Sequence, residues 1–207
     1  MIRLLLSLLW LGTIAYIVFI APGARGAEDS TMFELFTMQE GQEPLLMAVF
    51  SWMGLWPLIF ACLLLRKDDA NIPAWPFVIA SVGLGAFALL PYFIAASRKG
   101  VRANRSAKFV MKLASSKIIY LLLGGVAAGL LWLAAQGSIE AYWQAMQSSH
   151  FVHTMTIDFL ILPIIATYAI YRDQTRDLFG KRKFPSIVGL IPMVGTLIYL
   201  WRAGGRH

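Results

Sequence analysis

The residue best suited to do chemistry in this 207-residue chain is Asp158. It lies inside an apolar run that begins at Phe151, about 10 Å along a helix from the start of that run. A charged carboxylate at such a depth in a membrane costs roughly 2.5 to 3.5 kcal/mol on insertion scales, so a partner, a water-lined cavity or protonation must compensate. A neutral acid in an apolar pocket is a proton donor, and beside a base it could isomerise a double bond or open an epoxide.

Three polar neighbours could act with Asp158. His153 and Asp158 are separated by about 140° around a helix, so a direct contact between them is not expected. Thr154 lies one turn before Asp158, where its hydroxyl could hydrogen-bond the carboxyl group. His150 and His153 with one carboxylate are too few donors to predict a metal site. Asp158 is therefore predicted to be either an interhelical hydrogen-bonding group or a proton site, with His153 as the second catalytic candidate and no cofactor-binding residue assigned.

The composition places these residues in a membrane. Hydrophobic residues make up 58% of the chain and charged residues 14%, and the mean hydropathy is +0.67. The only cysteine, Cys62, excludes a disulfide scaffold, and its apolar surroundings favour an inert thiol. The net charge of +7 comes from basic residues that flank apolar runs, which indicates membrane topology and argues against nucleic-acid binding.

Runs of about 20 apolar residues predict membrane-spanning helices, because a helix rises about 1.5 Å per residue across a core of about 30 Å. We therefore predict an all-α fold, a polytopic transmembrane helical bundle of about six spans that forms a single integral membrane domain over residues 1–207. The six runs are Leu4 to Ala21, Pro44 to Leu65, Ala74 to Ala96, Ile118 to Ala135, Phe151 to Tyr171 and Phe184 to Trp201.

The first run could also be a secretory signal peptide, because Arg3 precedes it and small residues follow it. Its apolar part is longer than the usual 7 to 15 residues of a signal, which favours a retained helix. If all six runs cross, the positive-inside rule places residues 98–117 and 172–183 in the cytoplasm or stroma and both termini opposite. The acidic first loop, residues 22–43, then lies on the basic side, which a cleaved or re-entrant first segment would change.

Two further patterns concern packing. Prolines inside the runs predict kinked helices, and kinks permit a ligand cavity within a bundle. Gly125 and Gly129 have the spacing of a close helix contact, which most simply lies within the molecule. Pairs at one-turn spacing among residues 172–177 are expected to be solvated ion pairs. No internal repeat is visible in the sequence. The prolines are Pro57, Pro91, Pro163 and Pro192.

Three segments carry a resemblance to known proteins. FVHTMTIDFLILP, LLMAVFSWMGLWPLIFACLLL and IPAWPFVIASVGLGAFALLPYF resemble a group of uncharacterised small multi-pass membrane proteins of cyanobacteria and plastids. The spacing of His153 and Asp158 is also similar to a His-four-Asp signature of the neoxanthin synthase type of plastid carotenoid membrane protein, which usually has four spans. That similarity implies a role for Asp158 and His153 in handling an isoprenoid or carotenoid within the bilayer.

The sequence therefore leads to a ranked set of expectations. The first is a protein of a photosynthetic membrane, thylakoid, cyanobacterial plasma membrane or plastid, that binds or transforms a lipophilic isoprenoid or carotenoid-type ligand, with its cofactors unknown. The second is a non-enzymatic accessory or assembly protein that docks to a photosynthetic complex. A transporter is third, because broken helices suit transport sites but no repeated half is visible.

Overall fold

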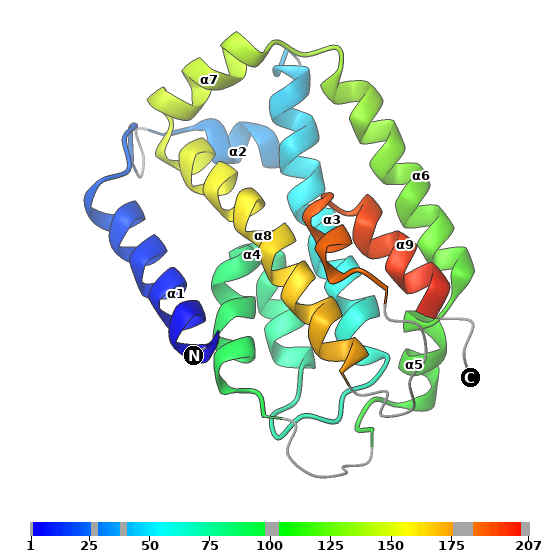
Figure 1. Ribbon diagram of the computed structural model, residues 1–207. Helices are drawn as coiled ribbons and strands as arrows, with labels where there is room; N and C mark the ends of the chain where they lie inside the picture. The colour runs from blue at the N-terminus through cyan, green and yellow to red at the C-terminus, as the bar shows by residue number, and fades with distance from the viewer. Residues whose placement is uncertain (1, 26–28, 38–40, 98–103, 176–183, 204–207) are drawn as a thin grey trace.

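The computed structural model describes residues 2–25, 29–37, 41–97, 104–175 and 184–203, and the regular elements within these ranges are helices (Figure 1). The predicted all-α bundle is confirmed. In chain order the elements are α1 (Ile2–Phe19), α2 (Thr31–Phe36), α3 (Pro44–Leu65), α4 (Trp75–Ala95), α5 (Lys108–Ala114), α6 (Lys117–Ala134), α7 (Ile139–Ser148), α8 (His150–Gln174), the short 3₁₀ helix η2 (Ser186–Leu190) and α9 (Val194–Ala203).

Among the described residues, five helices are long and apolar enough to cross a membrane: α1, α3, α4, α6 and α8. Large apolar side chains also cover much of their outer surface, including Leu121 on α6 and Leu160 on α8, which are 62% and 63% exposed. An outer surface of this kind is stable in lipid and unfavourable in water. The chain is a multi-pass integral membrane protein.

Helix α4 bends back on itself at Gly85, where φ is 48° and ψ is −125°. A straight helix of 21 residues would separate its ends by about 30 Å. Instead, the segments that flank α4 lie together, since the Asn71 N–H donates to the Ser97 carbonyl at 2.9 Å. The Phe77 and Tyr92 rings, from its two arms, are 5.5 Å apart. The prediction that Ala74 to Ala96 crosses the membrane is therefore corrected: α4 is a re-entrant hairpin of two half-helices.

The last predicted run, Phe184 to Trp201, is a second hairpin rather than one span. Pro192 has no N–H and disfavours a helical Ile191, and the chain reverses there through Met193, whose φ is 57°. The arms η2 and α9 then lie side by side, with the Phe184 and Tyr199 rings 6.3 Å apart. The prediction of a continuous helix over this run is corrected for that reason.

The two hairpins reveal a repeated order of elements that the sequence did not show. The first half consists of a crossing helix (α1), a short helix (α2), a second crossing helix (α3) and a hairpin (α4). The second half repeats this order with α6, α7, α8 and the η2–α9 hairpin (Figure 1). The expectation of no internal repeat is thus corrected at the level of architecture.

Helices α3 and α8, the inner helix of each half, correspond at three positions. The N-caps of the two helices are Glu43 and Ser149, and their internal prolines are Pro57 and Pro163. The two N-caps are as far apart in the sequence as the two prolines. Arg66 and Arg172, near their C-terminal ends, have that same separation. The two inner helices pack against each other and against the hairpins, so most of the large core cluster lies around them.

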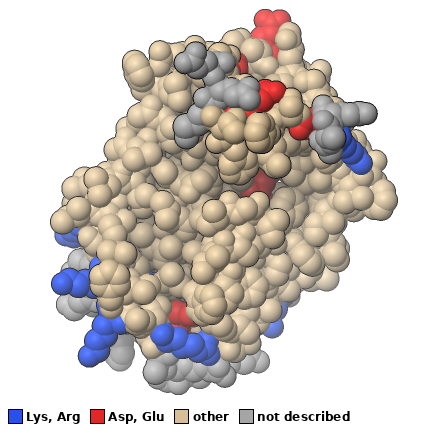
Figure 2. All heavy atoms as spheres, turned by 180° about the vertical axis from the view of Figure 1, so that it is seen from behind, with Lys and Arg blue, Asp and Glu red and all other residues tan. Residues whose placement is uncertain are grey.

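This topology also explains the distribution of charge. Among the described residues, every Lys and Arg except Arg25 belongs to the end where α1 and α6 begin, and Asp29, Glu34, Glu43 and Glu140 belong to the other end. Figure 2 shows the same separation, with basic side chains toward one end and acidic side chains toward the other. The orientation predicted from six spans split the basic residues between both sides, and it is corrected because both hairpins return. The positive-inside rule assigns the basic end to the cytoplasmic side of the membrane.

Candidate functional site

Asp158 extends from α8 into the bend of α4. Its Oδ1 atom accepts a hydrogen bond of 2.8 Å from the Ala86 N–H, and the residue is only 3% exposed. A Cβ atom on Gly85 would lie 1.7 Å from Asp158 Oδ2. Position 85 therefore requires glycine for two reasons: its φ is positive, and the Asp158 carboxyl group occupies the space that a Cβ atom would need.

The bend in α4 supplies what a buried carboxylate needs. Ala86 begins the second half-helix, so its N–H has no acceptor within the helix and carries part of the positive end of the helix dipole. Asp158 satisfies that donor from the neighbouring helix. Farther along, Pro91 cannot donate to the Phe87 carbonyl, and the Trp10 indole N–H donates to it instead at 3.1 Å. These two backbone groups in the apolar layer thus have side-chain partners.

His153, the second predicted site residue, has different partners. Its Nδ1 lies 3.2 Å from the Met146 carbonyl and its Nε2 lies 3.0 Å from the Tyr16 hydroxyl. His150 lies farther out, with Nδ1 3.4 Å from the Pro22 carbonyl. The structure therefore does not bring His153 and Asp158 together in one cluster, as their angular separation on a helix predicts.

Two other expectations about this region can be compared with the structure. The Thr154 hydroxyl is buried without a hydrogen-bond partner, so the predicted bond from Thr154 to Asp158 is wrong. The described part of the chain contains no group of three His, Cys, Asp or Glu residues arranged to hold a metal ion.

A groove of about 460 Å³ separates α1 from α8. These two helices make few contacts, whereas α6 packs extensively along α3 in the equivalent place of the other half. The groove is open to the bilayer side, because Leu8 and Ile164 on its two walls are 59% and 47% exposed. The α1 wall consists of Leu8, Leu9, Gly12, Thr13 and Tyr16, and the α8 wall of Ile157, Leu160, Ile161 and Ile164.

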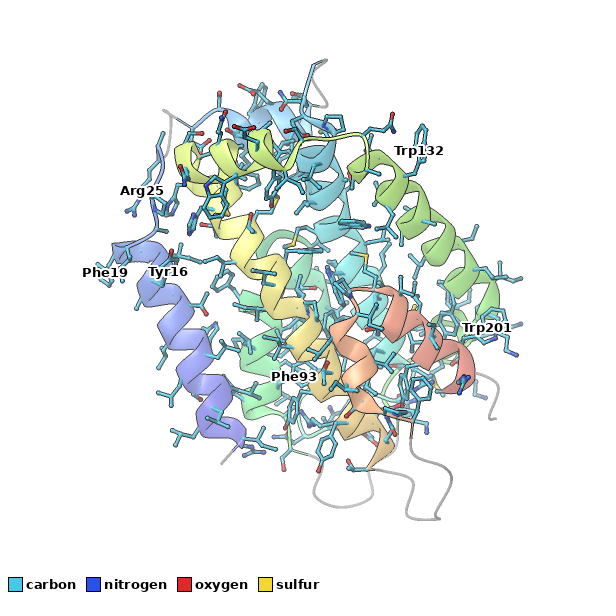
Figure 3. The ribbon with its side chains drawn as sticks, turned by 45° about the horizontal axis from the view of Figure 1, so that its top comes forward. Tyr16, Phe19, Arg25, Phe93, Trp132 and Trp201 are labelled. Carbon is cyan, nitrogen blue, oxygen red and sulfur yellow. The ribbon has the colours of Figure 1, made fainter. Side chains whose placement is uncertain are left out.

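The groove is elongated and has one polar end. Its α1 wall extends from Leu8 to Tyr16, which is about 12 Å along a helix. Figure 3 shows Tyr16 near the end of α1, and its hydroxyl bonds to His153 on α8. The predicted site residue His153 thus contributes to the groove through Tyr16, a residue that sequence analysis did not single out.

A buried ionic cluster holds the basic end together, and sequence analysis missed it. Arg66, the C-cap residue of α3, forms an ion pair with Asp173 of α8, and Tyr199 of α9 donates its hydroxyl to the same carboxylate oxygen. Arg66 and Asp173 are 3% and 7% exposed. The prediction that residues 172–177 form only solvated pairs is therefore wrong for Asp173, while residues 176 and 177 lie outside the described residues.

In the part of the chain that the structure describes, these features define a membrane protein with four crossing helices, two re-entrant hairpins and a lipid-facing groove. Comparisons with models of known families, with curated proteins and with solved structures find no match to the chain.

Proposed function

We propose that this protein binds an elongated lipophilic molecule, of the isoprenoid or carotenoid class, in the groove between α1 and α8. The supporting observation is the groove itself: it is apolar along about two helical turns, polar at one end and open to the bilayer. A site with these walls favours a molecule that partitions into lipid and enters sideways. The resemblance described above adds a photosynthetic membrane as the proposed location.

The contacts of the two candidate residues support different roles within this proposal. His153 bonds to Tyr16 at the polar end of the groove, where a ligand head group would lie. Asp158 caps the second half of α4 and is not among the residues that line the groove. We therefore propose that His153 acts through Tyr16 in binding and that Asp158 supports the hairpin against which α1 packs. The presence of four crossing helices agrees with the usual number in the neoxanthin synthase type.

A groove-filling variant tests the proposal. Gly12 lines the groove, and an added Cβ atom there meets nothing within 4 Å. Gly12→Phe therefore adds a bulky side chain to the groove wall at a position where its Cβ atom meets no neighbour. Gly125 on α6 is a matched control, because it is also an exposed helical glycine with nothing within 4 Å.

The measurement is mass spectrometry of apolar compounds extracted from protein purified in nanodiscs. We expect a chain-like compound enriched over the bulk lipid in the wild type and in Gly125→Phe, and reduced at least tenfold in Gly12→Phe. Equal enrichment in all three proteins, or none in the wild type, would overturn the proposal.

The accessory or assembly role is a second candidate, and one surface favours it. On α6, Gly125, Ala128 and Gly129 are exposed and do not pack within the molecule, contrary to the predicted intramolecular contact. A face of small residues lets another helix approach closely in lipid. If this role is correct, native electrophoresis after mild solubilisation shows comigration with a large complex, and Gly125→Phe releases the protein whereas Gly12→Phe does not.

A further inference from the structure

The hydrogen bonds at the polar end of the groove determine which atoms of His153 and Tyr16 donate a proton and which accept one. The Met146 carbonyl can only accept, so in the neutral His153 ring the proton lies on Nδ1. The Nε2 atom of that ring is then an acceptor. The Tyr16 hydroxyl, 3.0 Å away, must donate its only proton to Nε2.

The hydroxyl proton of Thr13, the other polar side chain of the groove, is also used in a hydrogen bond within the protein. Thr13 donates its hydroxyl proton to the Leu9 carbonyl at 2.7 Å, one turn earlier in α1. Thr13 and Tyr16 are the two residues with polar side chains among those that line the groove in the described structure. Both retain lone pairs on oxygen and neither retains a proton, so what the groove can offer a ligand is hydrogen-bond acceptors.

We infer that the groove selects lipophilic molecules whose polar end donates a hydrogen bond, and that isoprenoid alcohols therefore bind in preference to ethers, esters or aldehydes of the same chain. The ligand hydroxyl donates to Tyr16 Oη, which extends the chain of hydrogen bonds through His153 to the Met146 carbonyl. An ether or aldehyde oxygen placed there would face another oxygen with no proton between them, which in an apolar site is unfavourable. This inference rests on the proposed function and adds the end group of the ligand.

Competition binding tests it. Tritiated geranylgeraniol is bound to wild-type protein in nanodiscs, and unlabelled geranylgeraniol, its methyl ether and the aldehyde geranylgeranial compete for the site. We expect the alcohol to compete at about tenfold lower concentration than the other two. If the wild type shows no saturable binding, or if saturable binding persists in Gly12→Phe, both this inference and the groove proposal are overturned. Equal competition by all three compounds at a site that Gly12→Phe closes would overturn this inference alone.

Two variants test the assigned proton directions. Tyr16→Phe removes the acceptor at the polar end of the groove and leaves only the buried Thr13 hydroxyl, so the affinity for the alcohol falls about tenfold to that of the ether, whose own affinity stays unchanged. His153→Leu removes the atom that takes the Tyr16 proton, so the hydroxyl can donate to a ligand and the ether and aldehyde gain affinity relative to the alcohol. Thermal unfolding identifies any variant that has lost its fold, and the remaining variant then decides. An alcohol preference that survives in a folded Tyr16→Phe protein would overturn the inference.

Discussion

The two halves of the chain repeat one order of elements but pack their outer helices differently. Helix α6 buries Tyr120, Leu123 and Ala127, which form a continuous stripe along one face. Helix α1 buries only Leu6 and Thr13, almost two turns apart. The surface of α1 between these two residues is not covered by α8, and the groove lies along it. A repeated scaffold thus becomes a binding site where one of two equivalent interfaces stays open.

The hairpins differ in a corresponding way at their tips. The first reverses at Gly85 and leaves the Ala86 N–H for Asp158 of the other half to accept. The second reverses at Pro192, which has no N–H, and the Gly195 N–H reaches the Ile191 carbonyl nearby. The residue of α3 equivalent to Asp158 is Trp52, which carries no acidic group. The acid therefore lies on the inner helix that faces the hairpin with an unsatisfied N–H, and the equivalent position of the other inner helix has none.

The largest effect that separates the halves is expected at Arg66 and Arg172, the equivalent residues of α3 and α8. Arg66→Met removes the cation from the buried pair with Asp173, and breaking such a pair costs about 3 to 5 kcal/mol. Arg172 is half-buried, donates to the Ala96 carbonyl and lies over the Phe93 ring, so Arg172→Met should cost about 1 kcal/mol.

Unfolding in detergent by heat or denaturant measures both changes. The double variant Arg66→Met/Asp173→Leu should recover much of the loss, because no buried charge is left behind. Equal destabilisation by Arg66→Met and Arg172→Met would contradict the difference drawn between the two halves.

A second difference concerns the Gly85 bend. Gly85→Ala forces a side chain into a backbone conformation with positive φ and against the Asp158 carboxyl group, at a cost of about 2 to 3 kcal/mol. Gly83→Ala is the control, because it is an exposed glycine of the same helix with nothing within 4 Å. We expect the control to be neutral or slightly stabilising in the same unfolding assay. A tolerated Gly85→Ala would show that the hairpin does not depend on this bend.

Asp158 allows a sharper comparison between capping and proton chemistry. Asp158→Leu leaves the Ala86 N–H buried without an acceptor and should cost about 1 to 3 kcal/mol. Asp158→Asn keeps an oxygen in the same place and should cost less than about 1 kcal/mol. Pigment analysis of a deletion strain complemented with Asp158→Asn then separates the roles. An altered profile with a stable Asn protein would show that the carboxyl proton is needed, whereas a wild-type profile supports capping.

The sequence predicts the helices and the membrane class, because apolar runs of sufficient length have few other stable structures. It does not predict the reversals. Run length alone cannot distinguish a crossing helix from two arms that return, and the signals at the turns, Gly85 and Pro192, also occur in ordinary kinked spans. The acidic first loop, which six spans placed among the basic loops, was the one available sign that two runs do not cross.

The candidate site was predicted in part for a similar reason. The depth of Asp158 in an apolar run indicates that something must satisfy it, but not that a backbone N–H of a hairpin does so. His153 was identified by its type and spacing, whereas Tyr16 lies far away in the sequence and had no comparable signal. The partner of Asp173 was missed because one-turn spacing favours local pairs, while Arg66 reaches it from another helix.

The smallest expected effect concerns the N-terminal caps of the two inner helices, at Glu43 for α3 and Ser149 for α8. The Glu43 carboxylate alone accepts from the Leu46 N–H, whereas Ser149 is assisted by Asp29, which accepts from the Ser149 hydroxyl and the Phe151 N–H. Partial burial opposes ionisation of Asp29, but these hydrogen bonds outweigh it and lower its pKa below the ordinary value of 3.8.

Because the pKa of Asp29 is lower in the folded protein, its stabilising contribution is complete above the ordinary value and disappears as the pH falls through the folded value. Asp29→Asn should therefore lower stability at neutral pH by less than about 1 kcal/mol and should flatten the acid limb of the stability curve. Unfolding midpoints measured from pH 7 to pH 3 check this, with Glu34→Gln, another acidic residue at the same end, as the control. An unchanged acid limb in Asp29→Asn would show that the α8 cap does not depend on this charge, and that Ser149 alone caps α8 as Glu43 alone caps α3.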